Sequence, residues 1–210
     1  MKLAFACSAL LFSATLAIAQ NNEVPRFSGS IAGGFTNPLG TTGEHLDTGW
    51  NIQGGAGVNF NAWLGAQIQG QFDDFGINRT TLDNAGFPDG AVHVFSATID
   101  PIVHLTPHSH ADIYLIGGGG LYHVYHEFTQ PTVAAVTGYD PFFGFFTVGV
   151  PADQVLASYS VNKPGWNGGM GIAFGTKYHG KFFAEARFTH VFMSRGVHMD
   201  YLPVSFGFRW

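Results

Sequence analysis

The chain has 210 residues, a formal net charge of −5 and only 11% charged residues. The excess of acidic residues leaves no basic surface for a nucleic-acid partner, and a single cysteine, Cys7, excludes a disulfide framework. With 29 glycines, 21 phenylalanines, 7 tyrosines and 4 tryptophans, the composition combines poor helix formers with strand-favouring aromatics. This composition predicts an all-β fold.

The first residues, 1–19, are predicted to form a secretory signal peptide. Lys2 gives a positive start, a short apolar run follows, and Ala17-Ile18-Ala19 forms a cleavage site before Gln20. The apolar run is too short, and too soon followed by polar residues, to be a good membrane anchor. We therefore expect export and a mature chain of residues 20–210 that forms one domain without cysteine.

Eight segments of the mature chain alternate apolar and polar residues with a period of two, as half-buried strands do. In chain order they are 27–35, 50–60, 63–75, 92–104, 111–125, 166–174, 181–192 and 201–210. The last segment runs to Trp210 with Leu202, Val204, Phe206 and Phe208 on the same face as that residue. A soluble protein rarely leaves such a strand as an exposed edge, so the pattern favours a closed barrel.

The connections between the predicted strands alternate between short and long. Those at 59–61, 106–110 and 175–180 are tight, whereas 36–49, 76–91 and 127–164 are extended and 193–199 is intermediate. Short turns on one side and long loops on the other are typical of outer-membrane barrels. We predict an all-β fold, an eight-stranded antiparallel up-and-down transmembrane β-barrel with both termini on the periplasmic side.

This layout assigns two sets of side chains. Eight strands leave a barrel centre that is filled by side chains, so the charged groups within it must pair. The predicted polar core of the lumen consists of Gln67, Gln69, Gln71, Asp73, Asp100, Asp112, Glu185, Arg187 and Arg209. Trp50, Trp63, Trp166 and Trp210 fall near strand ends, where rings with an apolar body and a polar N–H settle at the membrane–water interfaces.

The pattern resembles the small bacterial outer-membrane β-barrel proteins with an OmpA-like or OmpX-like eight-stranded barrel, over residues 26–210. Its most specific part is Phe206, Phe208 and Trp210, similar to the signal that the barrel-assembly machinery reads in that group, although a terminal Phe is more frequent there. The resemblance implies a Gram-negative outer membrane, surrounding lipid that includes lipopolysaccharide, and insertion by that machinery. The peptidoglycan-binding domain of the larger members has no counterpart in this sequence, so a tethering role is not implied.

The 10 histidines invite a metal-site hypothesis. His108 and His110 share one predicted turn, and His123 and His126 lie three residues apart near a strand end. Zinc sites usually bring three or four ligands together, often with closer and repeated spacing. We therefore expect turn or interface histidines, with no metal and no cofactor.

A second chemical hypothesis is a barrel-embedded hydrolase that resembles the outer-membrane lipid A deacylases, built from Glu185, His190 and Ser194. The strand pattern argues against it, because His190 shares a face with Phe188 whereas Glu185 lies on the opposite face. The sequence also contains no nucleophile elbow and no phosphate-binding loop. We therefore expect no enzymatic activity.

The long connection contains Phe142, Phe143, Phe145 and Phe146, a density of apolar side chains that commonly marks an interaction surface. Packing over the barrel and a dip into the outer leaflet are the alternatives for this segment. The predicted function is a non-enzymatic envelope protein with a structural, adhesion or surface-interaction role through its extracellular loops. A channel or transporter for small or hydrophobic solutes is the alternative function, and a secreted β-sandwich is the competing fold.

Overall fold

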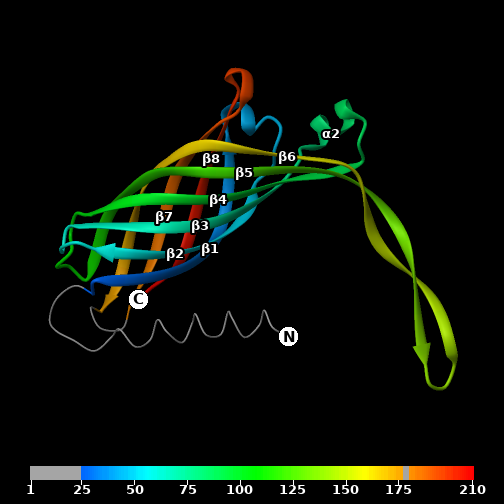
Figure 1. The fold of residues 1–210 in the computed structure, drawn as a ribbon, viewed down its shortest axis with the longest axis horizontal. Helices are drawn as coiled ribbons and strands as arrows, with labels where there is room; N and C mark the ends of the chain where they lie inside the picture. Colours follow the sequence, from blue (N-terminus) through cyan, green and yellow to red (C-terminus); the bar gives the residue numbers. More distant parts are fainter. Residues whose placement is uncertain (1–24, 177–179) are drawn as a thin grey trace.

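The computed structural model describes residues 25–176 and 180–210, so the predicted signal peptide lies outside the described residues. The strands are β1 (Phe27–Leu39), β2 (Gly49–Asn59), β3 (Leu64–Gly76), β4 (Asp89–His104), β5 (Ala111–Asp140), β6 (Gly144–Thr176), β7 (Gly180–Phe192) and β8 (His198–Arg209). Each strand pairs antiparallel with the next, and β1 also pairs with β8, which closes the sheet into a barrel (Figure 1). The predicted eight-stranded antiparallel barrel is confirmed. Within the described ranges, no helix is long and apolar enough to cross a membrane.

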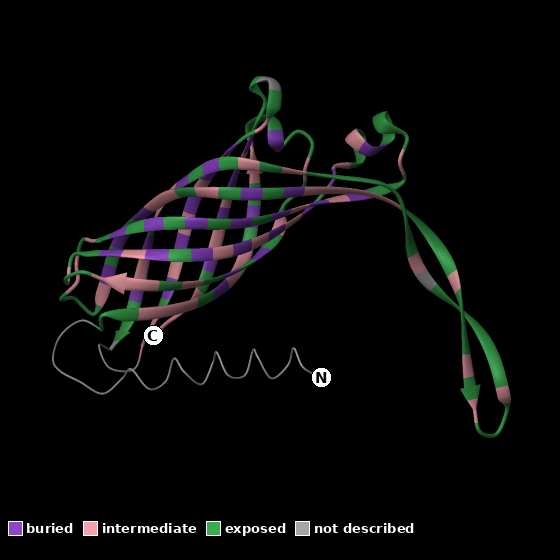
Figure 2. Cartoon of the chain, in the orientation of Figure 1, coloured by how far each residue is buried: buried purple, intermediate pink, exposed green. Residues whose placement is uncertain are grey.

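The alternation that predicted the strands is also the alternation of burial in the structure. Along β3, Gln67, Gln69 and Gln71 are buried, whereas Ile68 faces outward and is exposed. Figure 2 shows the same alternation of buried and exposed residues along most strands of the barrel. The barrel is therefore polar in the middle of its interior and apolar on its outer wall.

The prediction for residues 127–164 was wrong, because this segment continues β5 and β6 as one long hairpin. The two strands pair without interruption from Ala111 with Phe174 to Asp140 with Gly144, apart from a register shift at Phe128 and Thr129. Beyond that shift the hairpin has no further neighbour in the sheet, since Asp89, the first residue of β4, pairs with Thr129. Both its faces are solvent-exposed, so no buried face imposed a period-two pattern on its sequence.

We call residues 129–155 the arm. It leaves the barrel, turns away from it and ends far from the other strands (Figure 1). Twelve residues from Thr129 to Asp140, at a rise of about 3.3 Å each, give a reach of about 40 Å. The arm therefore does not fold over the barrel mouth, which was one of the alternatives for this segment.

Short helical pieces occupy the connections at the same end of the barrel: η2 (Gly40–Thr42), α2 (Arg79–Ala85) and η3 (Ser194–Gly196). Asn78 caps α2 by accepting a hydrogen bond from the Thr80 amide, and Gly86 ends it with a positive φ of 76°. Leu82 is the buried residue of α2 and packs in the apolar cluster at the barrel mouth. A helix of seven residues leaves too short a periodic pattern to be predicted.

Candidate functional site: the sealed interior, the outer wall and the arm

Arg187 on β7 is the centre of the polar network inside the barrel. Its Nε donates to Glu185 Oε1 at 2.5 Å, its Nη1 to Asp100 Oδ2 at 2.9 Å, and its Nη2 to Gln69 Oε1 at 2.6 Å. The side chain is buried, as are those of its three partners. A planar guanidinium with a fork of donors can bind two carboxylates and an amide in this way, which an ammonium group cannot reproduce.

Amide, hydroxyl and carboxyl groups extend this network in both directions around the lumen. Asp100 also accepts hydrogen bonds from Asn167 Nδ2 at 2.9 Å and Thr98 Oγ1 at 2.8 Å, and Glu185 accepts one from the Tyr114 hydroxyl at 2.8 Å. A chain of side-chain hydrogen bonds then runs through the remaining members, Gln53, Gln67, Gln69, Gln71, Asp73 and Thr36. Tyr114, Asn167 and Thr98 were missed as members, although the period-two pattern places them on the inward face.

The structure places Gln67, Gln69, Gln71, Asp73, Asp100, Asp112, Glu185 and Arg187 inside the barrel. It does not bring all of them together. Asp112 lies nearer the end of the barrel opposite the arm, where His104 Nδ1 approaches it at 2.8 Å and Lys181 Nζ at 3.2 Å. Arg209 is half-buried at the same end, and its guanidinium lies over the rings of Tyr114 and Phe183 at 4.8 and 5.1 Å.

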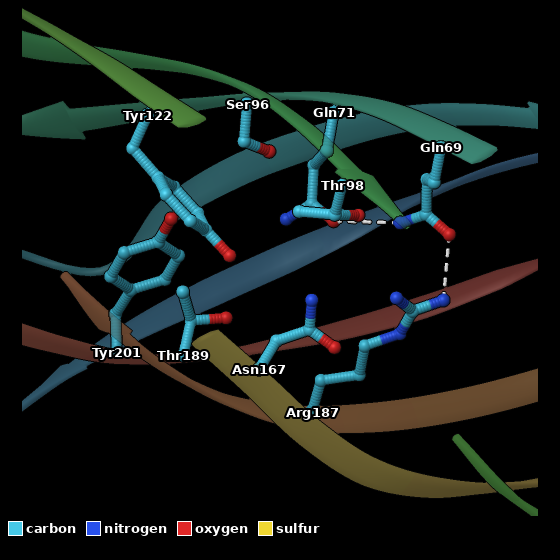
Figure 3. A pocket seen from close by; sticks show the side chains of 9 residues that line it. All are labelled: Gln69, Gln71, Ser96, Thr98, Tyr122, Asn167, Arg187, Thr189 and Tyr201. Atoms are coloured by element: carbon cyan, nitrogen blue, oxygen red, sulfur yellow. Dashed lines mark hydrogen bonds between the residues drawn. The ribbon is translucent and has the colours of Figure 1, made fainter. Parts of the chain in front are cut away.

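Apolar clusters close the lumen on both sides of the network. The cluster at the end of the barrel from which the arm extends contains Phe75, Ile77, Leu82, Val92, Val94, Tyr122, Val124, Val191, Met199 and Tyr201. The cluster at the opposite end contains Ala32, Ile102, Tyr114, Ile116, Ala173 and Phe183. The cavity between the polar side chains, drawn in Figure 3, has a volume of about 10 Å³, which is room for about one water molecule. The described interior is therefore a packed core and provides no aqueous path.

The outer wall carries the side chains that a soluble protein would bury. Exposed residues on it include Ile31, Ile52, Ile68, Phe95, Ile99, Leu121, Met170, Phe182 and Phe206. Trp50, Trp63 and Trp166 are also exposed. Trp50 and Trp63 lie near opposite ends of the barrel strands, at the start of β2 and just before β3. We refer to the exposed apolar residues of the wall as the apolar belt, the surface that a barrel presents to lipid.

The C-terminal strand is fixed at the seam of the barrel. The backbone of Trp210 exchanges two hydrogen bonds with Gly29, at 3.0 and 2.9 Å, just beyond the register of β1 and β8. Phe206 is exposed on the outer wall, and the rings of Phe208 and Trp210 stack with centroids 6.3 Å apart. The three residues therefore line one outward face of the seam, at the end of the barrel opposite the arm.

The histidines do not converge on a metal site in the described residues. His108 and His110 are exposed in the turn between β4 and β5. His123 is exposed on the outer wall, whereas His126 is half-buried, because residues three apart on a strand face opposite sides.

The three hydrolase candidates also lie apart. Glu185 points inward to Arg187, and the Ser194 hydroxyl accepts a hydrogen bond from Lys163 Nζ at 2.6 Å. His190 faces outward, where its Nδ1 lies 2.6 Å from Asp200 Oδ1, a partner that sequence reasoning missed. The strand geometry thus pairs the histidine with an acid but supplies it with neither of the predicted partners.

Among the described residues, the tip of the arm carries the most exposed apolar side chains. Phe142 and Phe143 are 90% and 88% exposed, and Phe145 and Phe146 are exposed beside them. Asp140 Oδ1 accepts hydrogen bonds from the amides of Phe142 and Phe143, at 2.7 and 3.1 Å, which fixes the turn. The Tyr139 ring packs against Phe145 with centroids 5.1 Å apart. The tip is thus an ordered turn that presents aromatic rings to the outside.

Comparison with protein-family models and with curated sequences gives no match. Among solved structures, the barrel is similar to Ail, the attachment invasion locus protein of Yersinia pestis, which was solved in complex with the heparin analogue sucrose octasulfate. The two sequences are 16% identical, the match covers 88% of this chain and 99% of Ail, and the TM-score is 0.50. It is also similar to Neisserial surface protein A: 13% identity, 87% and 95% covered, TM-score 0.51. A third similar structure is a major outer membrane protein from Thermus thermophilus. It is 9% identical, the match covers 88% of this chain and 98% of that protein, and the TM-score is 0.53. The chain has the fold of the small outer-membrane β-barrels.

Proposed function

We propose that the protein is an integral, non-enzymatic barrel of a Gram-negative outer membrane, which displays the arm as an interaction surface outside the cell. In this proposal lipid, including lipopolysaccharide, surrounds the apolar belt, and the barrel-assembly machinery recognises Phe206, Phe208 and Trp210. The observation that carries the proposal is the combination of a sealed interior with an exposed aromatic tip at the end of an arm about 40 Å long. Such a molecule has a membrane anchor and a contact surface but no route for a solute.

The outer wall supports the membrane location. Replacing contact with water by contact with lipid at the exposed apolar residues is favourable by roughly 25 cal/mol per Å². No charged residue occupies the outward positions of β3 from Leu64 to Phe72 or of β4 from Phe95 to Val103. Ile68 and Ile99 lie opposite each other there, and Leu121 on β5 pairs with Ala97, the next outward position of β4. The rings of Trp50 and Trp63 then mark the two interfaces.

The chemistry of the arm supports a contact made through aromatic rings and backbone. The sequence has no lysine or arginine between Arg79 and Lys163, and the arm carries two acids, Asp140 and Asp153. Ail has been solved with a sulfated sugar, and a polyanion of that kind needs basic partners that this arm lacks. We infer that the arm binds an apolar surface instead, since exposed aromatic side chains dominate such contacts.

The experiment that tests this function compares cells that display the wild-type protein with cells that display a variant in which Phe142, Phe143 and Phe145 are replaced by serine. We expect the wild type to increase retention of cells on hydrophobic polystyrene, and the triple variant to return it to the level of cells without the protein. A variant with Val133→Ser and Val136→Ser, on the shaft of the arm, is the matched control and should keep most of the retention. Equal retention of the wild type and the triple variant would contradict the role of the tip.

The membrane location and the sealed interior have their own measurements. A heat-modifiable band on SDS gels in the outer-membrane fraction is expected for the folded barrel. Planar bilayers that contain the purified protein should show no steady conductance above the lipid background. Regular conductance steps would favour a channel and contradict the packed interior.

A further inference from the structure

A shallow groove of about 320 Å³ opens on the outer wall of the barrel, where β3, β4 and β5 lie side by side. It is lined by Phe72, His93, Phe95, His123 and Tyr125. The register places Phe72, Phe95 and His123 opposite one another, and His93 with Tyr125 in the next outward row. Sites that hold small molecules have volumes from about 300 Å³ upward, so the groove is large enough for part of a ligand.

Stacked rings form the extracellular wall of the groove. The ring of His93 lies between those of Phe72 and Tyr125, with centroid distances of 5.8 and 6.0 Å and interplanar angles of 19° and 14°. Trp50 continues the row on the next strand, at 5.5 Å from Phe72. Rings packed in such a row form a rigid apolar wall, so their side chains lose little conformational entropy when a ligand binds.

On its periplasmic side the groove is not closed. The next outward positions on β3 and β4 are Gly70 and Ala97, which lie opposite each other. A Cβ atom at Gly70 would meet nothing nearer than a backbone oxygen at 3.9 Å. The following row is Ile68 and Ile99, both exposed. The groove therefore runs on over small residues into the apolar belt.

Polar groups lie at the extracellular end of the groove and along its β5 side. Trp50 Nε1 donates to Asp74 Oδ2 at 2.8 Å, and His93 Nδ1 lies 2.9 Å from Asp74 Oδ1 without the alignment of a hydrogen bond. On the far side, His123 Nδ1 and Asn162 Oδ1 are 2.7 Å apart. A ligand that fits this gradient has a polar end toward the cell exterior and an apolar chain toward the membrane centre.

We propose that the groove binds one acyl chain of an outer-leaflet lipid, with the lipid headgroup beside His93 and His123. The inference rests on the proposed membrane location, because its main support is that the groove is continuous with the apolar belt. Lipid is the occupant that surrounds this surface, and a flexible chain fits a groove between side chains. The groove then holds one lipid longer than the rest of the belt does.

The test uses purified barrels in vesicles of phosphatidylethanolamine and phosphatidylglycerol, released in mild detergent into a native mass spectrometer. Phe95→Ala removes one wall of the groove, and Phe174→Ala on β6 is the matched control, since both phenylalanines face outward and are 56% and 51% exposed. We expect one retained phospholipid on the wild type and on Phe174→Ala. Phe95→Ala should retain at least about fivefold less phospholipid, because the loss of roughly 1 kcal/mol of apolar contact lowers binding by about that factor.

A second variant, Ala97→Leu, blocks the periplasmic opening without removing a wall, and should also lower retention. Its control is Ala186→Leu, at an outward position of β7. Heat-modifiable mobility identifies the folded barrels that are compared. Equal retention by the wild type and both groove variants, or a wild type that carries detergent and no phospholipid, overturns the proposal. Absence of the heat-shifted band from the outer-membrane fraction overturns instead the membrane location on which it rests.

Discussion

Arg187 on β7 and Asp100 on β4 join two walls of the barrel through a 2.9 Å hydrogen bond between residues 87 positions apart in the sequence. The same guanidinium holds Glu185 and Gln69, so one side chain satisfies two buried carboxylates and an amide. Removal of the guanidinium would leave Asp100 and Glu185 as buried charges without their cation. That cost makes Arg187 the sharpest test of the sealed interior.

We expect Arg187→Leu to destabilise the folded barrel by about 3–5 kcal/mol, the usual penalty for breaking a buried ion pair from one side. The measurement is the urea concentration at which the heat-modifiable band is lost. Arg79→Leu is the control, because Arg79 lies on the exposed surface of α2 and pairs with Asp83 at 3.4 Å, a type of pair worth less than about 1 kcal/mol. An unchanged midpoint for Arg187→Leu would contradict the packed polar core.

The glycines of the strands differ in what a side chain would meet. A Cβ atom at Gly118 would lie 2.0 Å from the backbone oxygen of Ile99 and 2.6 Å from Asp100 Oδ1, whereas Gly70 has open space on the outer wall. We expect Gly118→Val to prevent folding or to cost at least about 1–3 kcal/mol, as overpacked interiors do. Gly70→Val should fold with near wild-type stability. The yield of heat-modifiable protein after refolding from urea measures both variants.

Much of this architecture was predictable from the sequence, because a barrel wall imposes a period of two wherever one face is buried and the other is apolar. Gln67, Gln69 and Gln71 were placed inside on that ground alone. Which groups bond within the lumen was not predictable, since it depends on how the ring of strands is staggered around the barrel axis. The hydrogen bonds that Arg187 and Asn167 donate to Asp100 join three different strands, so the pattern within any one strand could not predict them.

The strands of the arm could not be predicted from the sequence, for the opposite reason. Its two faces are both exposed, so apolar and polar residues follow one another without a period. Pro131 also lies within it and is normally a sign against a strand. A two-stranded ribbon beyond the sheet tolerates proline because its outer edges need no hydrogen-bond partner. Because both faces of the arm are exposed, we also predict that the arm contributes little to the stability of the barrel.

We therefore expect a variant in which residues 133–151 are replaced by an Asn-Gly turn to keep the stability of the barrel. Thr132 and Ala152 face each other in the ribbon, so a two-residue turn can join them. The free energy of unfolding obtained from urea titration of the heat-modifiable band should match that of the wild type within about 0.5 kcal/mol, as for surface changes elsewhere. Retention on polystyrene should fall to the level of the serine variant of the tip. A large loss of stability would show that the arm braces the barrel.

Substitution of the terminal tryptophan can distinguish a role in assembly in the cell from a role in the stability of the folded barrel. Trp210→Ala keeps the two backbone hydrogen bonds with Gly29 and removes a ring at the barrel edge. If the assembly machinery recognises this ring, the amount of protein in the outer membrane should fall several-fold, while refolding of purified protein into detergent micelles stays close to wild type. Trp63→Ala is the control, because Trp63 is also an exposed ring at the end of the barrel opposite the arm but lies outside the terminal strand. Equal losses in cells and in micelles would assign Trp210 to stability and contradict a role as an assembly signal.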